Sequence, residues 1–261
     1  MKRKIDRLKQ ILARMGSCLV AFSGGVDSSL LLWTAKDVLG TDNVVALTFS
    51  APIFPDSEHK KARIFSQNAG VNFITVDLDV FSIPHFSDNG PNRCYVCKKK
   101  LYEICWDKAV KLDMRYVVDG TNYDDLNDFR PGMKAAKELM VKSPLLEAQL
   151  RKMDIRRYCK QLGLFVWNKP SLACLASRFP CGIPITIEGL ERVNRAESFL
   201  RHLGLKDVRV RFHEELARVE VSTCDLPKVL RNREKIIQGL RPMGFSYVTL
   251  DLQGLHAQVK H

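Results

Sequence analysis

The 261-residue sequence lacks any apolar run close to the roughly 18 residues that indicate a membrane span. It also lacks a secretory h-region, because the segment after the basic first stretch is short and interrupted. Internal repeats and low-complexity tracts are missing as well. These absences argue against a membrane protein and a repeat protein, and we expect the chain to act in the cytoplasm.

Cysteine is too sparse for a disulfide scaffold, since eight cysteines are spread over the whole chain. In a reducing compartment, clustered cysteines more often hold a metal or take part in catalysis. The hydrophobic fraction of 46% is enough for a packed core. The net charge of +12 suits a nucleotide, a phosphorylated substrate or RNA. The densest run of lysines and arginines, at 151–169, fits either such an anionic ligand or a helix face exposed to solvent.

Strand-like and helix-like patterns alternate over the first two thirds of the chain. Strands are predicted at 18–23, 43–50, 71–78 and 114–120, and helices at 26–40, 57–69, 99–112 and from about 147. Apolar runs without polar alternation are typical of strands buried on both faces. We therefore predict an α/β fold with a doubly wound parallel sheet, whose site lies at the carboxyl ends of the strands.

The pattern changes after residue 182, where Gly and two prolines fall within 180–184. Residues 186–204 predict an amphipathic helix, and 207–221 predict a β-hairpin. A helix at 226–239 and a strand at 247–252 follow. The expected organisation is a first domain over 1–182 and a smaller α+β domain over 183–261.

A glycine-containing loop joins the first predicted strand to a helix. Gly24 and Gly25 let the backbone approach a phosphate, and the helix N-terminus supplies free N–H groups and positive partial charge. Ser23 and Ser28 would add hydroxyl donors. Asp27 would either stabilise the helix N-terminus or help to hold Mg²⁺. The lysine of a Walker A loop is absent, so this is a different kind of phosphate loop.

Two other strand ends carry candidate ligand-binding groups. At the end of the strand predicted at 43–50, Thr48 and Phe49 would line an adenosine pocket, and a capped strand is the alternative. The segment after the strand at 114–120 is either a binding turn or an ordinary Asx-rich turn. Its candidate residues are Gly120, Thr121, Asn122, Asp125 and Arg130.

Cys94 and Cys97 form a C-x-x-C pair that fits four readings: half a zinc site, a redox dithiol, two iron–sulfur ligands, or no chemistry. Cys174 lies among small residues with a guanidinium nearby, which favours a nucleophilic, metal-binding thiolate. For the cysteines within apolar or helical patterns we expect inert packing: Cys18, Cys105, Cys159 and Cys224.

The string SGGVDS, between a strand and a helix, resembles the S-G-G-x-D-S motif of the PP-loop ATP pyrophosphatase superfamily. That resemblance implies an adenine nucleotide α-hydrolase-like fold and cleavage of ATP between its α and β phosphates. Four further strings narrow it to the LarE family of ATP-dependent sulfur transferases: NRCYVCK, DGTNYDDLNDFRPG, KPSLACLASR and VRVRFHEELARVEV. Together they cover nearly the whole chain.

The resemblance implies adenylation of a carboxylate of pyridinium-3,5-biscarboxylic acid mononucleotide and its conversion to a thiocarboxylate. This product belongs to the synthesis of the nickel-pincer nucleotide cofactor of lactate racemase. ATP, Mg²⁺ and, in one branch of the family, a [4Fe–4S] cluster are the implied cofactors. The other branch takes sulfur from the cysteine of the CLASR motif itself.

This sequence has the three cysteines of the cluster-bearing branch, Cys94, Cys97 and Cys174. Three thiolates leave one iron open, where a sulfide can bind. Cys181 stands where the family usually has an aromatic residue, and we expect it to pack or to lie behind the ligands. With it, however, the cysteines are also enough for a zinc site. The implied catalytic residues are Cys174, Asp27, Ser177 and Arg178, and Lys98 would add positive charge beside the polyphosphate.

Arg209 and Arg211 alternate along one strand of the predicted hairpin, with Glu220 on the other strand. Guanidinium binds phosphate in bidentate fashion, so the resemblance favours these residues as the site for the substrate's phosphate. Cross-strand salt bridges on a solvent-facing hairpin are the alternative. Because family members form oligomers, we expect a homo-oligomer, served by a small-molecule nucleotide substrate and a sulfide donor.

Three other functions stay open on the sequence alone. A tRNA thiolase of the same superfamily can pair this loop with three cluster cysteines, although no RNA-binding appendage is visible, which argues against a nucleic-acid partner. An amide-forming synthetase, such as an NAD or GMP synthetase, leaves the three cysteines unexplained. The non-enzymatic reading is a zinc-containing nucleotide-binding protein.

Overall fold

The computed structural model describes residues 1–127, 131–170 and 173–255. The chain forms two compact units, one from Met1–Ile83 and Asn92–Leu172, the other from Pro84–Pro91 and Ala173–His261. The sequence placed the boundary after residue 182, whereas residues 173–182 group here with the second unit. One reason is Asn89, whose side-chain amide donates to the carbonyls of Pro180 at 2.6 Å and Ile183 at 2.8 Å.

The first unit contains a sheet of four parallel strands in the order β3-β2-β1-β4, which confirms the predicted α/β fold. The strands are β1 (Cys18–Ala21), β2 (Val44–Ser50), β3 (Asn72–Asp77) and β4 (Tyr116–Val118). The chain runs outward from β1 through β2 to β3 and then returns to pair β4 with the other side of β1. Ligands of such sheets bind where the direction reverses, at the carboxyl ends of β1 and β4.

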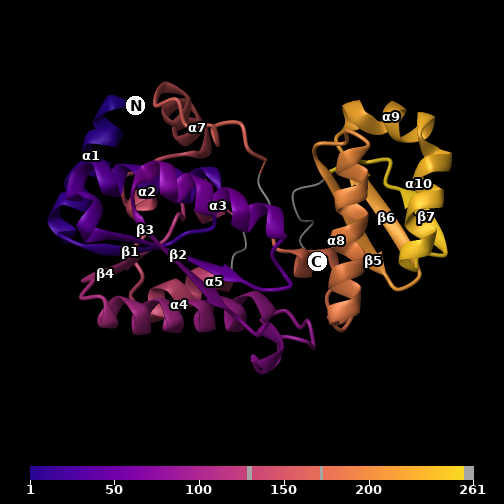
Figure 1. Ribbon diagram of the computed structural model, residues 1–261, viewed down its shortest axis with the longest axis horizontal. Coiled ribbons are helices and arrows are strands. Elements are labelled where there is room, and N and C mark those ends of the chain that lie inside the picture. The colour runs from indigo at the N-terminus through magenta and orange to yellow at the C-terminus, as the bar shows by residue number, and fades with distance from the viewer. Residues whose placement is uncertain (128–130, 171–172, 256–261) are drawn as a thin grey trace. The chain divides into compact units, whose positions relative to one another are not determined.

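Helices cover both faces of this sheet, with α2 and α3 on one side and α4 and α5 on the other (Figure 1). The helices of the unit are α1 (Lys2–Met15), α2 (Val26–Leu39), α3 (Asp56–Ala69), α4 (Arg93–Lys111), α5 (Pro131–Glu138), α6 (Pro144–Glu147) and α7 (Lys152–Gln161). β1 and β2 are buried on both faces because helices pack on both, as their continuous apolar runs indicate, whereas the edge strand β3 is only partly buried.

The second unit is the expected α+β arrangement. It consists of α8 (Ile187–His202), β5 (Val208–His213), β6 (Leu216–Val221), α9 (Leu226–Arg231), α10 (Arg233–Leu240) and β7 (Tyr247–Leu250). β5 and β6 form the predicted antiparallel hairpin, and β7 joins β6 in parallel. The helix predicted over 226–239 is divided at Asn232. Over the described ranges, every helix is too short or too polar to span a bilayer.

Candidate functional site

The loop after β1 has the geometry of an anion site. Gly24 adopts a left-handed φ of 67°, and Gly25 is the N-cap of α2. The Ser23 hydroxyl accepts a hydrogen bond from the Gly25 N–H at 3.3 Å and lies 3.1 Å from the Ser28 hydroxyl. A Cβ on Gly24 would come within 3.0 Å of the Ala62 Cβ, so only glycine fits this turn against α3. The loop therefore delivers the N-terminus of a long helix to the strand ends, where a phosphate can bind.

The turn after β4 is pressed against this loop. A Cβ on Gly120 would lie 2.8 Å from the Ser28 backbone nitrogen and 3.1 Å from its Cα. Gly120 thus allows a close approach between the end of β4 and the first turn of α2. Two of the sequence-predicted segments, far apart in the chain, are brought together at the point where the strand order reverses.

Asp119 holds the β4 turn in place. Its buried carboxylate accepts hydrogen bonds from the Tyr102 hydroxyl at 2.7 Å, the Ser143 hydroxyl at 2.7 Å, and the backbone N–H and hydroxyl of Thr121 at 3.1 and 2.8 Å. Burial, together with the Asp119 charge, raises the pKa of Tyr102 well above its usual range, so this phenol stays a donor. The Thr121 hydroxyl is therefore engaged in the turn, and no signal in the sequence pointed to Tyr102.

The next residues of the same turn position α7. The Asn122 N–H donates to Asp125 at 2.9 Å, and the Asn122 side-chain oxygen accepts from the Asp124 N–H at 2.9 Å. Asp124 in turn accepts from the backbone N–H of Lys152 at 2.8 Å. Asn122 and Asp125 are accordingly seen bracing the turn. Arg130, predicted for the same site, lies outside the described residues.

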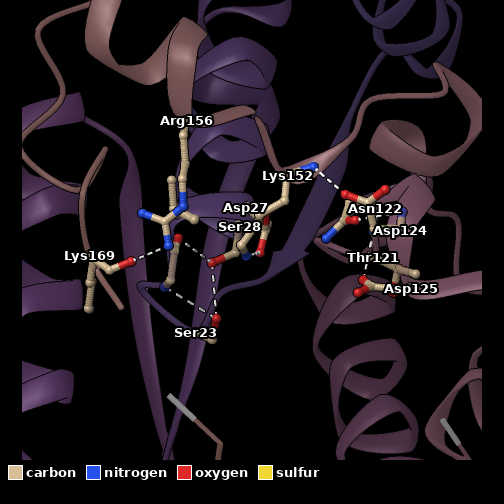
Figure 2. A network of polar contacts seen from close by, with 12 residues as sticks. Ser23, Asp27, Ser28, Thr121, Asn122, Asp124, Asp125, Lys152, Arg156 and Lys169 are labelled. Atoms are coloured by element: carbon tan, nitrogen blue, oxygen red, sulfur yellow. Dashed lines mark hydrogen bonds and ion pairs between the residues drawn. The ribbon is translucent and has the colours of Figure 1, made fainter. Parts of the chain in front are cut away.

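Asp27 lies in the first turn of α2, where its carboxylate is only half used (Figure 2). One oxygen forms an ion pair with the Lys152 ammonium. The other oxygen, Oδ1, is buried and has no hydrogen-bond partner among the described residues. An unpartnered carboxylate oxygen beside a phosphate loop is the donor type that Mg²⁺ prefers, so this residue fits the expected metal. The sequence offered one signal for Lys152, the basic run at 151–169.

A second lysine ties the segment after α7 to the loop. The Lys169 ammonium donates to the Gly24 carbonyl at 2.7 Å and forms an ion pair with Glu58 of α3. Arg156 donates to the carbonyls of Lys169 and Trp167 at 2.7 and 2.9 Å. Burial acts to raise the pKa of Glu58, but the hydrogen bonds and charges of its lysine partners outweigh burial and lower it. These cations surround the loop and favour a polyanion there.

At the end of β2, the Thr48 hydroxyl donates to the Phe22 carbonyl at 2.7 Å and is buried. Thr48 therefore braces the backbone that leads into the phosphate loop. Phe49 is also buried in β2. Their contact with adenosine stays a prediction.

Cys94 and Cys97 lie in the first turns of α4, which begins at Arg93 rather than at residue 99 as the sequence predicted. Their i, i+3 spacing puts both thiols on one face of the helix. Cys94 is exposed, Cys97 is nearly buried, and the Arg93 guanidinium donates to the Cys94 sulfur at 3.3 Å. Lys98 follows, with its ammonium 5.2 Å from the centroid of the Tyr102 ring.

The third predicted ligand, Cys174, belongs to the second unit and is half-buried. Within either unit, the described residues gather no group of three or more His, Cys, Asp or Glu side chains able to hold a metal ion. None of the eight cysteines, all of which lie in the described ranges, forms a disulfide. The three-cysteine set therefore draws on both units and stays a prediction.

The remaining cysteines divide by burial. Cys18, Cys105 and Cys159 are buried as expected, and burial raises the pKa of each thiol to about 12. Cys224 is exposed, which contradicts the expected packing, because the short turn that carries it faces solvent. Cys181 is exposed too, so it does not pack into a core.

The loop that carries Cys174 is held by a buried guanidinium. Arg178 is 2% exposed and forms a two-pronged ion pair with Glu197 of α8, at 2.7 and 3.2 Å. It also donates to the Ser177 hydroxyl at 2.9 Å, and the Ser177 N–H closes the turn on the Cys174 carbonyl at 3.0 Å. Arg178 thus positions the loop, and its guanidinium is committed to protein partners. No sequence pattern points to Glu197, whose partner lies 19 residues away.

The predicted phosphate site on the hairpin is also a network of charges. Arg211 pairs with Glu220 at 2.8 Å across the two strands and donates to the Ser177 carbonyl at 2.7 Å. The second oxygen of Glu220 is buried and has no hydrogen-bond partner in the described part of the chain. Burial, then the charges of Arg178 and Arg211, lower the pKa of Arg209, so positive charge is concentrated here. The cross-strand ion pair and a cluster of guanidinium groups are therefore both present on the hairpin.

The sequence is similar to a known protein family and to several known proteins. Residues 1–91 match the NAD synthase family. Pyridinium-3,5-bisthiocarboxylic acid mononucleotide synthase of Lactiplantibacillus plantarum is 40% identical over 91% of this chain and 86% of its own length. An uncharacterised protein of Synechocystis is 41% identical over 97% and 95% of the two chains. An uncharacterised protein of Methanocaldococcus jannaschii is 33% identical over 96% of each.

These similarities extend through both units, well beyond the phosphate loop that many nucleotide-binding enzymes share. The loop after β1, the turn after β4 and the parallel sheet agree with them. The chain belongs to the LarE family, the ATP-dependent sulfur transferases of the PP-loop superfamily that serve nickel-pincer cofactor synthesis.

Proposed function

We propose that this enzyme adenylates a carboxylate of pyridinium-3,5-biscarboxylic acid mononucleotide, releases pyrophosphate and replaces the activated oxygen with sulfur. The observation that carries the proposal is the half-used carboxylate of Asp27 beside the loop of Ser23, Gly24 and Gly25. The loop would cradle the pyrophosphate, and Asp27 would hold Mg²⁺ against it. Mg²⁺ supplies charge neutralisation of the phosphates when bound.

The turn after β4 supports binding of the nucleotide at the same place. Gly120 approaches the start of α2 closely, and Asn122 and Asp125 are fixed within hydrogen bonds of their own turn. ATP bound there would have its phosphates at the N-terminus of α2 and its adenosine toward Thr48 and Phe49. Cations of the loop, Lys169 among them, would stabilise the charge that develops on the leaving pyrophosphate.

The sulfur source we propose is a [4Fe–4S] cluster held by Cys94, Cys97 and Cys174. Cys97 lies five residues before Tyr102 on α4, about 7.5 Å along the helix axis. Because Tyr102 bonds to Asp119 at the end of β4, the first turns of α4, which carry both cysteines, would lie near the carboxyl end of the sheet. When bound, the cluster would supply an exchangeable sulfide as the nucleophile, delivered by a sulfide donor.

The hairpin of the second unit would bind the substrate's own phosphate. Arg209 lies near the guanidinium groups of Arg178 and Arg211, and guanidinium groups bind phosphate in bidentate fashion. Glu220 orients Arg211 and offers a buried, unpartnered oxygen to a donor group of the substrate, such as a ribose hydroxyl. Ser177, held between Arg178 and Arg211, would complete this wall of the site.

The test is to incubate the anaerobically purified protein with Mg·ATP, substrate and sulfide, and to follow AMP, pyrophosphate and thiocarboxylate. We expect all three products in equal amounts. Iron and sulfide analysis, with a thiolate-to-iron absorption band, checks the cluster. Zinc without iron would favour the zinc-containing binding protein, and thiolation of tRNA would favour the tRNA thiolase.

Substituting the cysteines one at a time separates the ligand sets. Serine at Cys94, Cys97 or Cys174 is expected to abolish the cluster, whereas Cys181→Ser is expected to retain it. Loss of the cluster in Cys181→Ser alone would show that the ligand set is wrong. Thiocarboxylate made stoichiometrically, with Cys174 losing its sulfur, would instead show the sacrificial branch of the family.

A further inference from the structure

Lys152 lies where three segments of the phosphate site meet. It is the first residue of α7, and its backbone N–H donates to Asp124 in the segment after β4 at 2.8 Å. Its side chain crosses to Asp27 in the first turn of α2, 125 residues away in the sequence. Figure 2 shows the ammonium beside that carboxylate. The contact therefore joins both strand-end segments to α7.

The two partners of this ion pair are each suited to another ligand. The free oxygen of Asp27 is buried without a hydrogen bond, a costly state for a carboxylate unless a cation or donor arrives. Mg²⁺ binds carboxylate oxygens, usually together with phosphates of the nucleotide. A lysine ammonium is a point charge on a flexible stem with three donors, and it serves commonly as a phosphate ligand. Mg·ATP brings a better partner for each of them at the same time.

The other cations of the loop are committed differently. The Lys169 ammonium is shared between Glu58 and the Gly24 carbonyl, and the Arg156 guanidinium holds two carbonyls of the segment after α7. Among the described residues, the only side chain that binds the Lys152 ammonium is Asp27. Its side chain is 29% exposed, so it has room to move. Lys152 is therefore the lysine that would lose its partner when Mg²⁺ binds to Asp27.

We infer that Lys152 changes partner when the nucleotide binds. In the free enzyme its ammonium neutralises Asp27, and with Mg·ATP it donates to an ATP phosphate oxygen while the metal takes the carboxylate. The inference rests on the proposed use of ATP. It makes Lys152 a phosphate-binding residue whose availability is set by the metal, and it makes metal and nucleotide bind cooperatively.

The experiment is a double-mutant cycle on ATP affinity, measured by titration calorimetry with a non-hydrolysable ATP analogue, in EDTA and in Mg²⁺. In EDTA, Asp27→Asn releases the lysine, and we expect affinity to rise about tenfold, the effect of one charge-assisted hydrogen bond. In the double variant with Lys152→Met, that gain should vanish. In Mg²⁺, Lys152→Met alone should weaken binding by a similar factor.

Lys9→Met is the matched control, because Lys9 forms an exposed ion pair with Asp37 at 3.0 Å on the same unit. It should leave the affinity unchanged in both buffers. If Asp27→Asn tightens binding equally with and without Lys152, the gain is only relief of repulsion, and the exchange is overturned while ATP binding stands. If the unsubstituted enzyme binds no analogue even in Mg²⁺, the proposed function falls, and the inference with it.

Discussion

Gly120→Ala tests whether the close approach of two strand ends builds the phosphate site. The new methyl group would come 2.8 Å from the Ser28 nitrogen, about 0.6 Å inside ordinary contact, and the obstructing atoms belong to backbone. Overpacking of this kind costs roughly 1–3 kcal/mol. The gain from restricting the unfolded chain is only about 0.4–1 kcal/mol. We therefore expect a net loss of roughly 1–2 kcal/mol of stability.

The first turn of α2 must move for the methyl group to fit, so ligand binding should suffer as well. Each charge-assisted hydrogen bond from the loop is worth about 1.5–3 kcal/mol, and misplacing one predicts a loss of tenfold or more in Mg·ATP affinity. Stability is followed by tryptophan fluorescence during urea unfolding. All three tryptophans, Trp33, Trp106 and Trp167, lie in the first unit, so the signal reports that unit.

With a urea slope of about 2 kcal/mol/M, the midpoint should fall by roughly 0.5–1 M. Gly90→Ala is the control, because a Cβ there meets nothing within 4 Å and the backbone is not left-handed. Because Gly90 lies in the second unit, the substitution should leave both the midpoint of the first unit and the affinity unchanged. An unaltered midpoint and affinity in Gly120→Ala would refute the close packing of the β4 turn on the phosphate loop.

Three further outcomes are expected. The folded-state pKa of Glu58 lies below 4.5, so its ion pairs stabilise the protein fully above pH 4.5 and this stability is lost as pH falls through the lowered pKa. In urea titrations at several pH values, Glu58→Gln should lack this acid dependence. A pH profile of the variant parallel to that of the unsubstituted protein would contradict the assignment. Iodoacetamide at pH 8 should label the exposed Cys224 within minutes. Buried Cys105, whose pKa is raised to about 12, should stay unlabelled until urea unfolds the chain. Mass spectrometry of the peptides gives the order in which the two cysteines are labelled. Arg178→Lys cannot reproduce the two-pronged ion pair with Glu197 and should loosen the loop that carries Cys174. In the cluster-free protein, the alkylation rate of Cys174 should then rise several-fold. An unchanged rate would argue against a positioning role for Arg178.

The sheet and the phosphate loop could be predicted because both leave local patterns. Continuous apolar runs specify strands buried on two faces, and the glycines before α2 stand directly at the loop they shape. Helix α1 is not among the predicted elements, although Ile5, Leu8, Leu12 and Met15 form its buried stripe. The lysines and arginines between these positions form the polar face of an amphipathic helix, so this helix also leaves a local pattern in the sequence.

The contacts that finish the site could not be predicted, because they join residues far apart in the chain. Lys152 reaches Asp27 over 125 positions, and Tyr102 meets Asp119 only because α4 packs beside β4. The sequence marks such residues as charged or aromatic members of helices and nothing more. Burial of Arg178 is a similar case, since an arginine is ordinarily read as a surface residue until its partner is seen.

The short segment Pro84–Pro91 belongs to the second unit although it is flanked on both sides by the first. The polypeptide therefore passes between the units three times, and no single cut yields two intact halves. On the ribosome, Asn89 emerges long before Pro180 and Ile183, the residues whose carbonyls it binds. At about 5–20 residues per second, it waits roughly 5–20 s for them. The order of synthesis thus makes the second unit complete only after the first, and Cys174 stands at the start of the long segment that completes it.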